Sequence, residues 1–334
     1  MNSNIKIIAE IASAHGGNIS ELKRLITESS MAKPDFIKLQ IYKFNELIHK
    51  DDAENHDLKV IEIPATDWKS ILLYCSKKNI NLITEVYDLS SFELLKENDA
   101  VSAFKIPTAD INNFDLLKAV SKEKKLTFVG IGGSSIDEIH NSIDAIKSNG
   151  CDDIVLMHGI QSFPTRVEDC ELNKIQTLKK EFRLPIGYAD HIDADDKLMS
   201  FSIPAIAANL GSEYIEKHIT LDRSRKGFDY YSSLNPNEFK DFISFIHKAY
   251  MSLGNSRNLQ LTSAEKQYRE KMKKHAILDS NVRKGDLVSS AVMKYMRTSE
   301  PGLTRLEINK LRNKKFLKDI PSGVRLSNNH FKND

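Results

Sequence analysis

Two histidines give this chain its clearest potential for metal chemistry. His191 ends the motif Tyr188-Ala189-Asp190-His191 and His218 lies within residues 215–222, each where an apolar run gives way to polar residues. In a barrel of alternating strands and helices, the C-terminal strand ends form a single active-site face. We therefore expect the two imidazoles to meet there as ligands of one metal ion. For either histidine alone, the alternative is a hydrogen-bonded residue at a strand end.

Two lysines indicate anion binding in the same place. Lys38 and Lys105 each interrupt an apolar run of strand type, and a buried ammonium is costly unless an anion compensates it. Phosphate and carboxylate groups are the natural ligands. Thr84 and Thr108, at the ends of the third and fourth runs, are candidates for further hydrogen bonds. On the lysines alone, a Schiff base with a carbonyl substrate remains an alternative.

Eight short apolar, β-branched runs alternate with amphipathic stretches. The runs that resemble strands are 5–11, 36–42, 81–86, 103–107, 126–131, 154–158, 185–188 and 214–219. Apolar residues recur at helical spacing between them, as in 20–31, 66–78, 135–148 and 236–253. Eight βα repeats within about 250 residues predict an α/β fold, a TIM (β/α)8 barrel. A doubly wound sheet is the alternative, but no GxGxxG motif follows any run.

A small second unit is predicted after the barrel. We assign the barrel to 1–255, a polar linker to 256–272 and the second unit to 273–334. Within it, residues 282–289 are echoed by 320–327: an apolar residue, a glycine turn, then an apolar residue and serine. The echo predicts a pseudo-symmetric, β-rich module. Its small size predicts that it docks on the barrel or on another subunit.

The composition is that of a globular protein. Of 334 residues, 40% are hydrophobic, and no run approaches the roughly 20 apolar residues needed to cross a bilayer. Residues 1–4 lack the features of a signal peptide, so a cytoplasmic, non-membrane protein is expected. Cys75, Cys151 and Cys170 are widely spaced, which favours buried or free thiols over disulfides.

The net charge of +2 is unevenly distributed along the chain. Residues 264–334 contain 17 Lys/Arg against 8 Asp/Glu, a charge of +9, which leaves −7 for the rest. Such a tail can steer an anionic small molecule or form a solvated surface. No nucleic-acid-binding motif accompanies it, so we do not expect nucleic acid as a partner.

Several motifs, taken in order, resemble the sialic acid synthase family, whose members condense phosphoenolpyruvate with a hexosamine to make nine-carbon acidic sugars. The tail similarly resembles the SAF (antifreeze-like) domain that ends those enzymes. The motifs are Ala9-Glu10-Ile11, His15-Gly16-Gly17, Ile37-Lys38-Leu39-Gln40, Phe104-Lys105-Ile106, Phe163-Pro164-Thr165, Tyr188-Ala189-Asp190-His191, Glu216-Lys217-His218 and Gly227-Phe228-Asp229.

The resemblance implies a role for each matching residue. His191 and His218 would hold Mn²⁺ or Mg²⁺, which polarises the acceptor's aldehyde as a Lewis acid. Lys38 and Lys105 would hold phosphoenolpyruvate. Glu10 would transfer a proton or orient water.

Further positions would contact the acceptor sugar, an N-acyl amino sugar. Gln40, Asp110 and Asp229 fall where the family contacts it, and Gln161 stands in for a shorter amide. Arg297 matches an arginine that reaches across from the partner subunit's SAF domain. A domain-swapped homodimer is therefore implied.

The chain departs from the family pattern at several polar positions. Gly130-Ile131-Gly132 replaces a Ser-Thr-Gly, Phe163 replaces a tyrosine and Ala189 a serine. Backbone amides of the glycine loop can substitute for lost hydroxyl donors. We expect an acceptor that is either N-acetylmannosamine or a diacetamido-dideoxy hexose leading to legionaminic- or pseudaminic-type acids.

Two other functions compete with this one. The first is another phosphoenolpyruvate-condensing synthase, making a shorter ketoacid; those enzymes usually lack a SAF domain. The second is a non-catalytic sugar-binding barrel. Against it stands the joint presence of Glu10, Lys38, Lys105, His191 and His218.

Overall fold

The computed structural model describes residues 5–254 and 259–331, which fall into two compact units, Met1–Gly254 and Asn255–Asp334. The residues examined for a signal peptide, 1–4, lie outside the described ranges. So do the start of the predicted linker, 256–258, and the last residues of the chain, 332–334. Each unit is described by itself.

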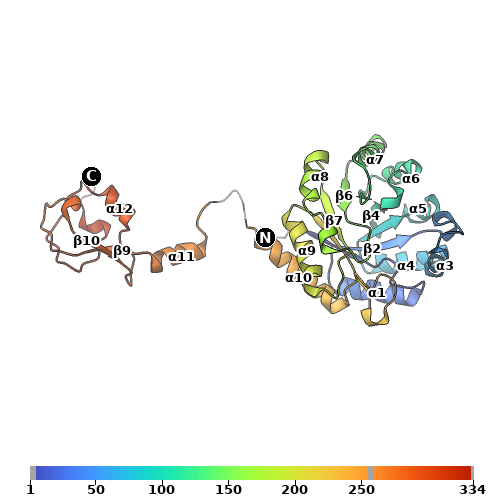
Figure 1. Cartoon of the computed structure of the whole chain (residues 1–334), viewed down its shortest axis with the longest axis horizontal. Coiled ribbons are helices and arrows are strands. Elements are labelled where there is room, and N and C mark those ends of the chain that lie inside the picture. Colours follow the sequence, from blue (N-terminus) through green and yellow to red (C-terminus); the bar gives the residue numbers. More distant parts are fainter. Residues whose placement is uncertain (1–4, 255–258, 332–334) are drawn as a thin grey trace. The chain divides into compact units, whose positions relative to one another are not determined.

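The first unit is a closed barrel of eight parallel strands, which confirms the predicted TIM barrel (Figure 1). Each strand pairs with the next, and β8 pairs with β1 to close the cylinder. All eight predicted runs form strands. They are β1 (Lys6–Glu10), β2 (Phe36–Ile41), β3 (Leu82–Val86), β4 (Val101–Ile106), β5 (Leu126–Gly130), β6 (Ile154–His158), β7 (Ile186–Asp190) and β8 (Tyr214–His218).

Helices surround the strands in the order that the sequence predicts (Figure 1). They are α1 (Ile19–Met31), α2 (Phe44–Leu47), α3 (Asn55–Ile61), α4 (Ala65–Lys77), α5 (Leu89–Leu95), α6 (Phe114–Ser121), α7 (Ile136–Ser148), α8 (Lys174–Phe182), α9 (Lys197–Asn209) and α10 (Pro236–Met251). Local caps define where they begin. The Asn18 side chain accepts hydrogen bonds from two backbone amides of α1, and Ser135 with Glu138 forms a capping box at α7.

Strand alternation separates two apolar layers and positions the polar one. Outward residues pack against the helices, whereas Ile8, Ile83, Ala103 and Phe128 belong to a small plug inside the barrel. Successive side chains of a strand point to opposite faces, so residues two positions further on also point inward. In β1, β2, β3, β4 and β8, the inward residue directly above the plug is charged. These residues are Glu10, Lys38, Glu85, Lys105 and Glu216. The sequence therefore places a charged layer directly above the plug.

The second unit has its own small core. The unit contains α11 (Ser263–Met272), β9 (His275–Leu278), β10 (Met293–Met296) and α12 (Arg305–Lys310), and its two strands pair antiparallel. Helix α11 lies inside the stretch predicted as a linker. A capping box of Thr262 and Glu265 begins it, and the Thr-x-x-Glu spacing was a readable signal.

The echoed segments of the second unit are paired in the structure. Val282 and Ile320, the first residues of the two copies, exchange backbone hydrogen bonds of 3.0 and 2.9 Å. Gly285 and Gly323 occupy equivalent positions, with φ of +93° and +86°. Such angles favour glycine, which explains why both copies carry one. The sequence echo therefore corresponds to a local structural repeat.

Two smaller predictions concern membrane-spanning segments and the cysteines. In the described ranges, no helix combines the length and apolar character needed to span a bilayer. Cys75, Cys151 and Cys170 are buried, free thiols, as predicted.

Candidate active site

A cavity of about 480 Å³ opens where the barrel strands end. Strands β1, β2, β3, β4 and β8 contribute its charged lining, and the loops after β6 and β7 complete it. Most of the predicted site residues line this one cavity: Glu10, Lys38, Gln40, Lys105, Thr108, Gln161, His191, His218 and Asp229.

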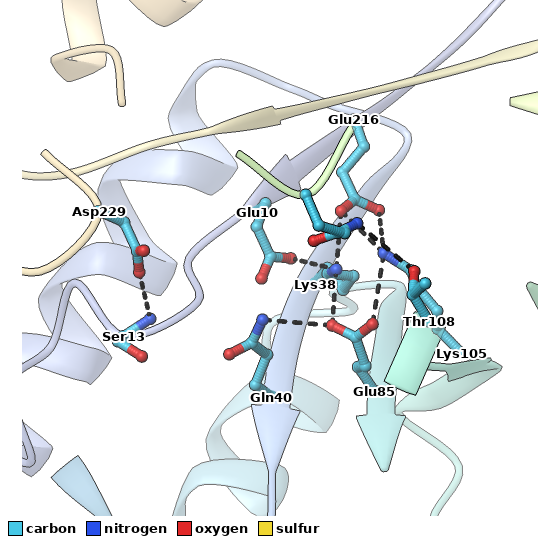
Figure 2. Close-up of polar contacts among 10 residues, drawn as sticks. Glu10, Ser13, Lys38, Gln40, Glu85, Lys105, Thr108, Glu216 and Asp229 are labelled. Atoms are coloured by element: carbon cyan, nitrogen blue, oxygen red, sulfur yellow. Dashed lines mark hydrogen bonds and ion pairs between the residues drawn. The ribbon is translucent and has the colours of Figure 1, made fainter. Parts of the chain in front are cut away.

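Lys38 lies at the centre of a buried charge cluster (Figure 2). Its ammonium contacts three carboxylates: Glu216 at 2.7 Å, Glu85 at 2.8 Å and Glu10 at 3.1 Å. Lys105 lies beside it, 3.0 and 3.1 Å from the two oxygens of Glu216 and 3.4 Å from Glu85. Lys38 donates hydrogen bonds to Glu85 and Glu216, whereas its contact with Glu10 is an ion pair without hydrogen-bond geometry.

This cluster corrects one step of the sequence argument. An external anion is not required to compensate the two lysines, because the protein supplies three carboxylates of its own. Any anionic ligand of Lys38 and Lys105 must replace some of these contacts.

The carboxylates of the cluster differ in their proton affinity. Burial alone would raise the pKa of Glu85 and that of Glu216, but Lys105 and Lys38 lower both below the usual value. For Glu10, burial dominates and raises the pKa well above the usual value, although Lys38 opposes the shift. Two ionised carboxylates thus balance two lysines, while Glu10 favours its protonated form.

The two histidines meet at the cavity wall, with ring centroids 5.3 Å apart. The Nδ1 of His191 hydrogen-bonds the backbone carbonyl of Ile160 at 3.0 Å, and a carbonyl accepts only, so Nδ1 carries the proton. The lone pair of Nε2 is then available. Within the described residues, Nδ1 of His218 has no hydrogen-bond partner. Burial lowers the pKa of His191 to about 4 and lowers that of His218 well below its usual value, so both rings are neutral near pH 7.

These features suit two ligands of a divalent metal ion. Neutral imidazole is the ligating form. The described residues offer no cluster of three His, Cys, Asp or Glu arranged to hold a metal. A metal ion held by the two histidines would take its remaining ligands from water and substrate oxygens, which hard cations prefer.

Three predicted site residues do not line the cavity. Thr84 is buried in β3, on the opposite face of the strand from its neighbour Glu85, and does not line the cavity. Asp110 is half-buried and accepts a hydrogen bond from the Asn113 side chain at 2.9 Å. Arg297 is exposed at the end of β10 in the second unit.

Among the cavity residues that sequence reasoning missed are Glu85, Tyr87 and Glu216. All three were readable from strand parity, because each lies on the inward face of its strand or directly beyond it. Glu85 also accepts a hydrogen bond from Gln40 at 3.2 Å, which links it to the cavity rim (Figure 2).

The other rim residues are held from several elements. Asp229 accepts a hydrogen bond from the Ser13 backbone amide at 3.0 Å (Figure 2). Gln161 donates one to Thr108 at 3.4 Å. Phe163 is 54% exposed and lies with its ring centroid 4.6 Å from that of His191. It therefore offers an apolar surface beside the imidazole pair.

Comparison with known proteins identifies the family. The model of the NeuB family matches residues 25–258. The chain belongs to the NeuB family. The resemblance read from the motifs is thus confirmed. A NeuB-family relative, the N,N'-diacetyllegionaminic acid synthase of Campylobacter jejuni, is 28% identical over 85% of this chain and 87% of its own.

Two further similarities extend over most of the chain. The pseudaminic acid synthase of Campylobacter jejuni is 28% identical over 99% of this chain and 98% of its own. The crystal structure of the N-acetylneuraminic acid synthetase of Leptospira borgpetersenii, 30% identical, covers 79% of this chain and 91% of its own with a TM-score of 0.72. This NeuB-family chain is accordingly an enzyme, a transferase of the sialic acid synthase type.

Proposed function

We propose that this NeuB-family enzyme condenses phosphoenolpyruvate with an N-acyl hexosamine to form a nine-carbon, sialic-acid-like sugar and phosphate. One observation carries the proposal: two lysine ammonium groups and a pair of neutral histidines line one cavity at the strand ends. The first suits an anionic donor and the second a metal-assisted carbonyl acceptor. The named synthases among its relatives support the same reaction class.

Lys38 and Lys105 hold phosphoenolpyruvate by exchanging partners. Oxygens of its phosphate and carboxylate take over ammonium donors that Glu216 and Glu85 occupy in the free protein. Thr108 and the backbone beside Gly132 line the same part of the cavity and add neutral donors.

The condensation forms one C–C bond, adds the oxygen of a water molecule to C2 and breaks the bond between C2 and the phosphate oxygen. C3 of phosphoenolpyruvate attacks the aldehyde carbon, water adds to the cationic C2, and phosphate leaves from C2. Glu10 favours its protonated form at the cavity floor and supplies a proton to the developing alkoxide. A Mn²⁺ or Mg²⁺ ion held by His191 and His218 would polarise the aldehyde.

The rim residues recognise the acceptor. Gln40, Gln161 and Asp229 offer polar groups, and Phe163 offers an apolar face. This combination suits a sugar that carries N-acyl or deoxy groups beside hydroxyls, either N-acetylmannosamine or a diacetamido-dideoxy hexose. The second unit is the SAF domain of this proposal, and Arg297 of one protomer reaches the acceptor in a domain-swapped homodimer.

Phosphate release tests the reaction directly. The protein is incubated with phosphoenolpyruvate, Mn²⁺ and a panel of N-acyl hexosamines, and phosphate is measured over time. We expect release that depends on one acceptor and is lost in His218→Ala. Lys179→Met, which removes an exposed ammonium paired with Glu213, is the matched control and should leave the rate unchanged. The proposal is refuted if the folded protein releases no phosphate with any acceptor of the panel in the presence of either Mn²⁺ or Mg²⁺.

A further inference from the structure

A second buried ion pair lies on the opposite side of the strands that carry the histidines. Asp190 directly precedes His191, and Lys217 directly precedes His218. The two are register partners on β7 and β8 and point outward, away from the cavity. Lys217 Nζ lies 2.6 Å from Asp190 Oδ2, and both side chains have no exposed surface.

The Lys217 ammonium contacts the chain on both sides of His191. Besides the Asp190 carboxylate, its ammonium donates to the backbone carbonyl of Ile192 at 3.4 Å. One ammonium, attached next to His218, therefore contacts the residues immediately before and after His191. The contacts that hold the backbone around His191 are therefore made by the residue next to His218.

Stability alone is a weak reason for such a pair. A buried ion pair costs so much desolvation that apolar residues of similar volume often serve equally well. An apolar pair has no preferred direction, whereas a short charged hydrogen bond fixes distance and orientation. The location of the pair, one residue behind each histidine, suggests that this geometric constraint is its purpose.

We propose that Asp190 and Lys217 are positioning residues that set the spacing of the His191 and His218 rings for metal binding. This inference rests on the proposed metal role of the two histidines. Outer partners that orient metal ligands typically contribute 10- to 100-fold to metal affinity. We expect an effect of that size, about tenfold or more, on affinity for the metal alone.

The test measures Mn²⁺ binding without substrate, from the electron paramagnetic resonance signal of free Mn²⁺. The double variant Asp190→Asn/Lys217→Met removes both charges and shortens only the lysine side chain, by one atom, so no unpaired charge is left to unfold the barrel. Leu156→Ala is the control: it opens a cavity on the outward face of the adjacent strand β6, away from the histidines. Trp68 fluorescence during urea unfolding shows that each variant is folded.

The outcomes separate the inference from the function on which it rests. Support requires that the wild type binds Mn²⁺, that His191→Ala abolishes binding, and that the double variant binds at least about tenfold more weakly while Leu156→Ala does not. Equal Mn²⁺ affinity of the wild type and the folded double variant overturns the positioning role alone. An equal loss in Leu156→Ala also overturns it, because the effect is then general. Absence of binding to the wild type overturns both the metal role and this inference.

Discussion

The charge cluster predicts that the same substitution has different effects at two neighbouring glutamates. Glu10→Gln and Glu85→Gln both replace a buried carboxylate with an amide of equal size. The pKa of Glu85 is lowered by Lys105 and Lys38 against the effect of burial, so Glu85 is ionised. The pKa of Glu10 is raised by burial, so its neutral form is favoured. Only the first change should remove a charge on which the fold depends.

The contacts give the size of each effect. Glu85 lies 2.8 Å from Lys38, 3.4 Å from Lys105 and 3.2 Å from the Gln40 amide. Breaking a buried ion pair costs about 3–5 kcal/mol. We expect a loss of about 3 kcal/mol in Glu85→Gln, because Glu10 can ionise and partly replace the lost charge. Glu10 has an ion-pair contact of 3.1 Å with Lys38 but, among the described residues, no hydrogen bond, so Glu10→Gln should cost less, about 1 kcal/mol.

The pH dependence follows from the direction of the pKa shift. A carboxylate whose pKa is lower in the folded state stabilises the fold above its unfolded pKa, about 4.3. That contribution is lost as pH falls through the lowered value in the folded protein. The difference in free energy of unfolding between wild type and Glu85→Gln should therefore be largest at pH 7 and shrink in acid.

Urea unfolding measures these differences in the barrel alone. Trp68 is the one tryptophan of the chain, is buried in the first unit, and reports that unit's unfolding by its fluorescence. A chelator keeps the samples metal-free. The reasoning is refuted if Glu10→Gln is as destabilising as Glu85→Gln at pH 7, or if the Glu85→Gln deficit is the same at pH 7 and in acid.

Three further substitutions test other parts of the site. Gly130→Ala would place a Cβ 2.5 Å from Thr108 Oγ1. We therefore expect about 1–3 kcal/mol of destabilisation in urea and a higher KM for phosphoenolpyruvate. Wild-type stability and KM would contradict the close packing. Thr84→Val replaces a buried hydroxyl that, within the described residues, has no hydrogen-bond partner. The free energy of unfolding in urea should therefore be unchanged or raised by about 1 kcal/mol. Altered steady-state kinetics would instead show that Thr84 contributes to the site. Arg297→Ala should raise the KM for the acceptor, measured by phosphate release, whereas the exposed neighbour Lys294→Ala should not; equal effects would argue against a specific role.

The fold was predictable because its signals are local. Each strand is a short apolar run, and each helix has its own apolar stripe and often its own cap, as at Asn18 and Ser135. Right-handed βα repeats of this number leave few topologies other than a barrel. Helix α11 was missed for the opposite reason: it buries no residue, so only its capping box marks it.

The site was only partly predictable, because side-chain direction depends on strand register. Thr84 and Glu85 are adjacent, and a single residue decides which of them faces the cavity. Motif position alone favoured Thr84. The inward layer set by Ile8 and Ile83 favours Glu85, and that argument requires knowing which apolar residues form the plug. Charge pairing between distant strands, such as Lys38 with Glu216, was likewise beyond any local pattern.

The balance of charge in the barrel bears on how an anionic substrate is held there. Two lysines face two ionised glutamates and a third that favours its neutral form, so the cavity floor has no net positive charge to attract phosphoenolpyruvate. Residues 1–263 carry −7 of the chain's formal charge, since the total is +2 and residues 264–334 carry +9. In the proposed reaction, an anionic donor would therefore be bound at short range, by exchange of carboxylate partners at Lys38 and Lys105.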